Sequence, residues 1–139
     1  MVRANVSKQQ VVDYVRKKLA EQPVYLDTET TGLEKTDEII EIAIVDHFGT
    51  VIFESFIRPS KPIPPAATRI NHITNEMVKD FPSWPDLWPT LRNFLIIKPI
   101  GMYNAEFDLR MLQQTFQNYG MPLKDKINAF DVMKIYSDY

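Results

Sequence analysis

The sequence contains no cysteine, two histidines and only four glycines among 139 residues. Without cysteine, neither a disulfide scaffold nor a zinc or iron–sulfur site with cysteine ligands can form. Long apolar runs are also missing, because stretches such as Phe94–Ile97 are far shorter than the roughly 18 residues that cross a bilayer. Residues 1–8 lack the apolar region of a signal peptide. We therefore expect a soluble, cytoplasmic protein that does not contact a membrane.

The charge is nearly balanced, with 16 Lys and Arg against 18 Asp and Glu and a formal net charge of −2. A protein that coats nucleic acid through its phosphates is normally basic, so this balance argues against a large non-specific electrostatic footprint. It is compatible with an enzyme that binds metal cations first and a phosphodiester second, because the cations invert the local charge.

The composition, 45% apolar and 24% charged, is that of a globular protein with one core. Residues 1–22 are predicted to contain an amphipathic helix, in which Ser7 and Gln10 have the spacing of a capping box and which Pro23 ends. Its expected apolar face consists of Val11, Val12, Val15 and Leu19. We expect this helix to precede a separate domain formed by residues 23–139.

The rest of the chain alternates between strand and helix signals, which predicts an α/β fold with a mixed sheet and helices on its faces. Pro89 is expected in the first turn of the helix Asp86–Ile97. The expected strands are Val24–Leu26, Ile39–Val45, Val51–Ile57, Pro99–Asn104 and Ile127–Phe130, and the expected helices are Ala66–His72, Thr74–Lys79, Asp86–Ile97, Ala105–Tyr119 and Asp131–Tyr139.

Asp27 and Glu29 are the first candidates for chemistry. Residues i and i+2 of a strand point to the same side, so the two carboxylates converge. Two such groups repel unless something positive lies between them, and oxygen ligands favour Mg²⁺ or Mn²⁺. The alternative is that they are solvated carboxylates in a loop, since acidic pairs are common.

A second polar cluster, Asn104–Asp108, also lies where a strand is expected to give way to a helix. Its simplest interpretation is that Asn104 or Asp108 caps the helix, which would contribute about 1 kcal/mol. Asp131 is likewise expected to cap a helix.

Together, the sequences DTETTG (residues 27–32) and NAEFD (residues 104–108) resemble the first two motifs of the DnaQ-like DEDD exonuclease superfamily. This group includes the proofreading subunit of bacterial replicative DNA polymerase. Between them, residues 69–74 are similar to the family's I-H-G-I-T segment, with His72 displaced to the glycine position. The resemblance extends from Val24 to the C-terminus.

The resemblance implies a ribonuclease H-like fold with a mixed five-stranded sheet, and 3′–5′ exonuclease activity that depends on two Mg²⁺ or Mn²⁺ ions. Asp27, Glu29 and Asp108 would hold the metals and form the catalytic set. The implied partners are a single-stranded 3′ end of DNA or RNA and, as a candidate, a DNA polymerase. The implied substrate-binding residues are Thr30, Thr31, Leu33, His72, Asn104 and Phe107, of which Phe107 could equally belong to the core.

The sequence departs from the family in its third motif, a histidine five residues before an aspartate or a tyrosine four residues before one. The residues five positions after His47 and His72 are Ile52 and Met77, and no tyrosine after Asp108 completes the other version. The fourth carboxylate and the general base are therefore missing, and we expect the fold to be truncated at its C-terminus. The alternatives are a natural short homologue, inactive or completed by another chain, and a non-catalytic nucleic-acid-binding or scaffold module.

A smaller departure is Tyr103, which stands where many relatives have histidine. We interpret this as a difference in packing.

Overall fold

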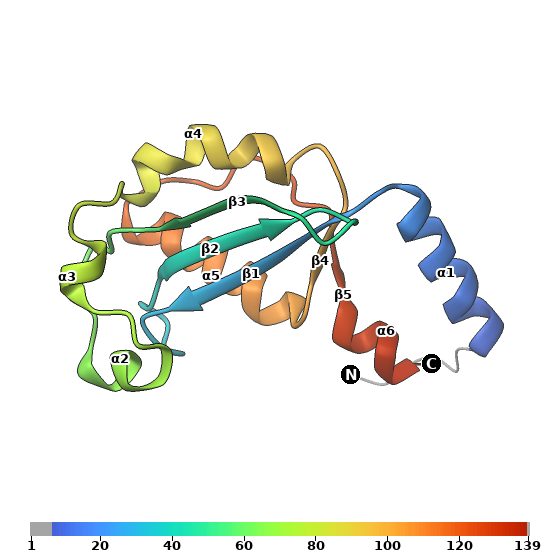
Figure 1. Ribbon diagram of the computed structural model, residues 1–139, viewed down its shortest axis with the longest axis horizontal. Helices are drawn as coiled ribbons and strands as arrows, with labels where there is room; N and C mark the ends of the chain where they lie inside the picture. The colour runs from blue at the N-terminus through green and yellow to red at the C-terminus, as the bar shows by residue number, and fades with distance from the viewer. Residues whose placement is uncertain (1–6, 139) are drawn as a thin grey trace.

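In the computed structural model, which describes residues 7–138, a five-stranded mixed sheet is flanked by helices (Figure 1). The strand order is β3-β2-β1-β4-β5; β1, β2 and β3 are antiparallel neighbours, while β4 and β5 run parallel to β1. The fold class predicted from the sequence is confirmed. The strands are β1 (Val24–Thr30), β2 (Ile39–Val45), β3 (Val51–Phe56), β4 (Ile100–Met102) and β5 (Ala129–Asp131).

Some of the helices lie at the ends of the sheet and others cover its face. In Figure 1, α1 and α6 lie at one end of the molecule, and α2 and α3 lie at the other. None of the helices in the described part of the chain is long and apolar enough to cross a membrane. The helices are α1 (Lys8–Ala20), α2 (Pro65–Asn71), α3 (Asn75–Val78), α4 (Trp84–Leu95), α5 (Ala105–Asn118) and α6 (Val132–Asp138).

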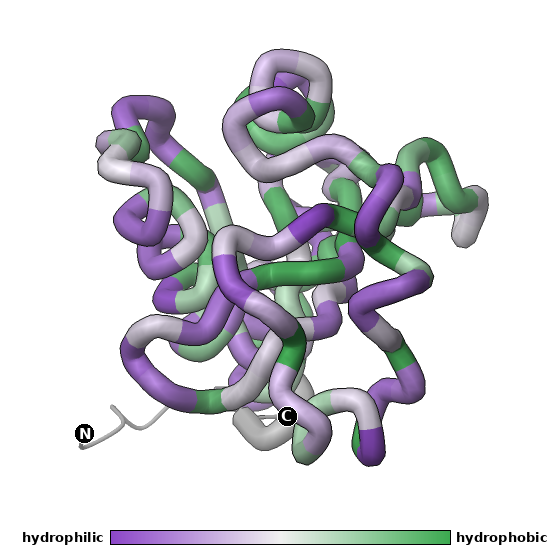
Figure 2. The backbone as a smooth tube through the Cα atoms, turned by 90° about the vertical axis from the view of Figure 1, so that its left-hand side faces the viewer, coloured by the Kyte–Doolittle hydropathy of each residue, from purple (hydrophilic) through white to green (hydrophobic). Residues whose placement is uncertain are grey.

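The main core lies between one face of the sheet and helices α4 and α5, and hydrophobic segments cross the middle of the molecule in Figure 2. Trp84 stacks on Trp88, and both rings meet the edge of Phe116 on α5. Trp84 is fully buried. The two tryptophans are therefore packing residues that join α4 to α5, because aromatic rings in this arrangement supply both area and specific geometry.

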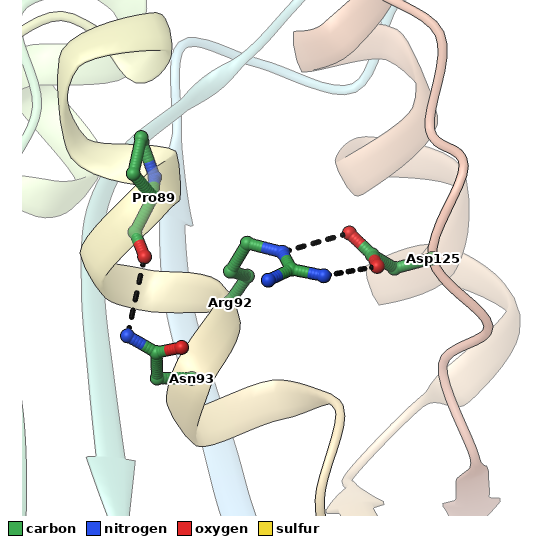
Figure 3. Close-up of polar contacts among 4 residues, drawn as sticks. All are labelled: Pro89, Arg92, Asn93 and Asp125. Carbon is green, nitrogen blue, oxygen red and sulfur yellow. Dashed lines mark hydrogen bonds and ion pairs between the residues drawn. The ribbon is translucent and has the colours of Figure 1, made fainter.

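Helix α4 begins earlier than predicted, so the expectation for Pro89 was wrong. Pro85 occupies the first turn, and the amide of Leu87 donates to the carbonyl of Ser83, which places Pro89 inside the helix. Proline has no N–H to donate there. Two side-chain contacts lie in the next turn: Asn93 donates to the Pro89 carbonyl at 3.3 Å, and Arg92 binds Asp125, which lies outside the helix (Figure 3).

The capping box of α1 is confirmed, since Ser7 and Gln10 exchange side-chain hydrogen bonds with each other's amides. The predicted apolar face is only partly correct. Val11 is buried, but Leu19 is 50% exposed. The reason is that α1 contacts α6 at the end of the sheet and contributes nothing to the main core.

Candidate active site

Strand β1 is longer than its apolar part suggests, and this extension builds the site. The predicted strand ended at Leu26, with a loop after it, whereas pairing with β2 keeps the backbone extended through Thr30. Asp27 and Glu29 therefore do point to one side of a strand, as the sequence indicated, and they are not loop residues.

The register adds an acidic residue that the sequence analysis missed. Glu41 on β2 lies directly opposite Glu29, and Asp27 lies opposite Ala43, whose other neighbour is Glu54 on β3. All four carboxylates thus share one face of the sheet. The predicted hairpin turn joins β2 to β3 and aligns Glu41 with Phe56, so it could not have revealed the pairing of Glu41 with Glu29.

The environment of Glu29 and Glu41 disfavours their charged forms. Burial raises the pKa of Glu29, and the charge of Asp27 raises it further. Burial also raises the pKa of Glu41, followed by the charges of Glu29, Asp27 and Glu54. Like charges opposite each other in a sheet are destabilising, so this face would be stabilised by a cation.

Asp108 lies in the first turn of α5 and is brought to the same region from a distant part of the chain. The hydroxyl of Thr28 donates to its Oδ1 at 3.3 Å, and its side chain is nearly buried. Burial raises the pKa of Asp108; the hydrogen bond from Thr28 opposes this, while the charge of Asp27 adds to it. The two acidic clusters predicted from the sequence therefore interact.

The carboxylates are not, however, gathered into a finished metal site. Between residues 7 and 138, no group of three or more His, Cys, Asp or Glu side chains is arranged to hold an ion. Asp27, Glu29 and Asp108 supply the oxygen ligands that Mg²⁺ and Mn²⁺ favour, so their chemistry fits such ions, but their side chains would have to turn toward a shared ion.

The threonines after Glu29 hold the loop that follows β1. Thr30 donates to the carbonyl of Gly32 at 2.9 Å. Thr31 is buried; its hydroxyl donates to Asp37 at 2.8 Å and accepts from the amide of Glu38 at 3.0 Å. These two hydroxyls are thus engaged within the protein.

Leu33 lies within this loop, and His72 ends a helix that is bonded to the end of β1. Leu33 is 71% exposed, which leaves its side chain available for an external contact. His72 ends α2 in the left-handed conformation, with φ 63°. Its neighbour Asn71 donates to the carbonyl of Thr30 at 3.1 Å, and this bond ties the end of α2 to the end of β1.

The residues in and next to the second cluster, Asn104–Asp108, have different roles in the fold. Asn104 caps α5, accepting from the amide of Phe107 at 3.4 Å, whereas Asp108 does not cap the helix. Phe107 is half-buried against the main core, and the guanidinium of Arg110 lies over its ring. Tyr103 is 72% exposed, so the interpretation of this residue as a packing difference was wrong.

Asp131 does cap a helix, as predicted, because its Oδ1 accepts from the amide of Lys134 in the first turn of α6 at 2.8 Å. Its second bond, in which Oδ2 accepts from the amide of Ala105 at 3.0 Å, joins residues 26 positions apart and follows from no local pattern.

Comparisons with known proteins agree with this architecture. A family model described as exonuclease (RNase T) matches residues 24–138. The exonuclease CP81 of Escherichia phage 186 is 38% identical over 106 residues, covering 76% of this chain and 55% of that protein. The DNA polymerase III subunit epsilon of Treponema pallidum is 38% identical over 90 residues, covering 62% of this chain and 42% of the subunit. The chain thus spans about half the length of these relatives.

Two solved structures are also similar. Exonuclease X in complex with 5′ overhanging duplex DNA matches with 36% identity and a TM-score of 0.53, covering 63% of this chain and 52% of that one. The nuclease domain of 3′hExo, a DEDDh family member bound to rAMP, matches with a TM-score of 0.61 and covers 73% of this chain and 61% of that one. At 17% identity, the latter shows the fold alone.

Proposed function

The chain belongs to the RNase T exonuclease family, and from this premise we propose that it carries the metal-binding half of a 3′–5′ exonuclease site. The observation that supports the proposal best is the hydrogen bond to Asp108, on α5, from Thr28, which lies between Asp27 and Glu29 on β1. Residues 80 positions apart in the sequence therefore meet at the end of a strand. The raised pKa values of Glu29 and Asp108, each with a nearby carboxylate as one cause, are a feature typical of functional sites.

Asp27, Glu29 and Asp108 would hold two Mg²⁺ or Mn²⁺ ions. When bound, such a pair activates a water molecule and stabilises the leaving oxygen in phosphodiester hydrolysis. The protein would keep these carboxyl groups in place and ionised. For Asp108, the hydrogen bond from the Thr28 hydroxyl favours the ionised form that a cation requires.

The substrate would be a single-stranded 3′ end of DNA or RNA. Leu33 supports this proposal through its exposed side chain beside the acidic strand end. Thr30 and Thr31 would contribute through the shape of their loop, because their hydroxyls already have partners. His72, Asn104 and Phe107 complete the proposed contacts. Phe107 offers only part of its ring, since the rest packs against the core.

The name of one relative points to a candidate partner protein. The Treponema relative is a subunit of DNA polymerase III, and we propose a DNA polymerase as a candidate partner of this chain. The third motif is absent from the 139 residues, so a general base and a fourth carboxylate would have to come from elsewhere. General-base catalysis alone contributes about 10²- to 10⁴-fold.

The test is to measure Mn²⁺ binding by titration calorimetry and hydrolysis of a 3′-labelled single strand, for the wild type and for Asp27→Ala. We expect Mn²⁺ to bind the wild type and at least tenfold more weakly to Asp27→Ala. Asp13→Asn is the matched control, because Asp13 is exposed on α1, where it accepts a hydrogen bond from Gln9. Unchanged Mn²⁺ affinity in Asp27→Ala, or no binding by the wild type, would refute the proposed site.

The missing third motif favours a second candidate, a nucleic-acid-binding module without catalysis. This module would bind single-stranded DNA equally well with EDTA and with Mn²⁺. The exonuclease site predicts instead that binding of the 3′ end requires the cation, because the acidic face repels phosphate.

A further inference from the structure

Asp131 joins the beginnings of two helices. Its Oδ2 accepts from the amide of Ala105, the first residue of α5, at 3.0 Å, and its Oδ1 accepts from the amide of Lys134 at 2.8 Å. A third bond runs beside them: the amide of Met133 donates to the carbonyl of Tyr103 at 3.3 Å. The turn that leads into α5 is therefore held to the start of α6 by both backbone and side chain.

The position of Ala105 makes this arrangement relevant to the site. The amides in the first turn of a helix have no partner within the helix, so an outside acceptor determines how that turn is held. Ala105 lies three residues, less than one turn, before Asp108. The cap that Asn104 provides to Phe107 is long, at 3.4 Å, so the Asp131 bond is the shorter of these two bonds from backbone amides of this turn to side chains.

We propose that Asp131 is a positioning residue for the cation site: through the amide of Ala105 it holds the first turn of α5 so that Asp108 stays against Thr28, the residue between Asp27 and Glu29 on β1. This inference rests on the proposed function. Asp131 is not itself a ligand in it, because both of its oxygens are engaged by backbone amides. Residues that orient metal ligands typically change metal affinity by about 10- to 100-fold when they are replaced.

The role requires a carboxylate. Two N–H donors need two acceptor oxygens, whereas an asparagine side chain offers one oxygen and an NH₂ group that would face the second donor. Capping α6 alone needs only one acceptor, which asparagine or serine supplies well. Asp131→Asn and Asp131→Ser therefore keep the cap of α6 and lose the bridge to α5. Both also remove a negative charge that acts on Asp108, so the exchange rate at Ala105 is the readout specific to the bridge.

The experiment compares these two variants with the wild type by calorimetric titration with Mn²⁺ and by amide hydrogen exchange in the full chain. We expect Mn²⁺ affinity to fall at least tenfold and exchange at Ala105 to accelerate, while the amide of Lys134 stays protected. Ser7→Ala is the control. It removes a side-chain cap from α1, and we expect lower stability with unchanged Mn²⁺ affinity.

The variant Asp108→Ala identifies which idea has failed. If Asp108→Ala weakens Mn²⁺ binding but both Asp131 variants bind like the wild type, the positioning role is refuted and the proposed function stands. If Asp108→Ala also binds like the wild type, the proposed function is refuted together with this inference. Equal losses of affinity in Ser7→Ala and Asp131→Asn would show a general effect of stability and would also overturn the positioning role.

Discussion

Asp108 is the residue at which stability and the proposed function conflict. It is nearly buried, and burial raises its pKa despite the hydrogen bond from Thr28. A carboxyl group whose pKa is higher in the folded state binds protons more tightly there than in the unfolded chain. Stability then falls as the pH rises from the ordinary aspartate value through the raised one. The ionised form that a cation needs is the form that burial disfavours.

We therefore predict that Asp108→Asn raises the thermal midpoint of the metal-free protein at pH 7. The neutral amide avoids the cost of a buried charge, and its oxygen can still accept from Thr28. Thermal unfolding at pH 5 and pH 7 measures the effect, which should be larger at pH 7. A lower midpoint for the variant at pH 7 would show that the charge stabilises the fold. Adding Mn²⁺ should stabilise the wild type more than the variant.

Gly32 is a second residue whose identity the fold requires. A Cβ at this position would lie 2.5 Å from Oδ2 of Asp37, the residue that also binds the Thr31 hydroxyl and the amide of Glu34. The carboxylate would have to move, and the loop after β1 would lose its closing contacts.

We predict that Gly32→Ala destabilises the protein by about 1–3 kcal/mol, the usual cost of overpacking. Gly120→Ala is the control, because Gly120 also has a positive φ but nothing lies within 4 Å of the added methyl group. Urea denaturation should show the greater loss for Gly32→Ala. Equal losses would mean that backbone strain alone, and not the contact with Asp37, explains the requirement for glycine.

Among the elements, helices α1 and α4 differ in how much apolar surface they bury. Helix α4 buries Leu91 and Leu95 completely. Helix α1 buries Val11, while Val15 and Leu19 line a groove of about 130 Å³ beside α6. Both helices have amphipathic sequences, but only α4 faces the main core.

We predict that Leu91→Ala costs about 2–5 kcal/mol, whereas Leu19→Ala costs less than about 1 kcal/mol. The first substitution leaves a cavity in a closed core, and the second removes a side chain that is half in solvent. Urea denaturation of the two variants measures the difference. Similar costs would mean that α1 is packed more tightly in solution than its exposure indicates.

For the whole molecule, we propose that residues 23–139 are the folding unit and that the N-terminal helix is an addition to it. The sheet, the main core and the candidate site all lie after Pro23. The contacts of α1 are made at the end of the sheet: it packs against α6, and Lys18 lies over the ring of Phe130.

We predict that a chain beginning at residue 23 still unfolds cooperatively and binds Mn²⁺ like the wild type, with a stability lower by about 1–3 kcal/mol. This loss corresponds to the burial of roughly one apolar side chain. Denaturation and calorimetry test both parts, with a chain beginning at residue 7 as the control. A shortened chain that fails to unfold cooperatively would place α1 within the folding unit.

The sequence determined the types and order of the elements, because hydrophobic periodicity and caps act over a few residues. It also identified Asp27, Glu29 and Asp108 as candidates through two short motifs. Tertiary structure alone decided which groups meet: Glu41 opposite Glu29, Thr28 against Asp108, and Asp131 between two helices. These contacts depend on strand register and helix docking, which arise from packing between segments far apart in the chain, and no local pattern encodes them.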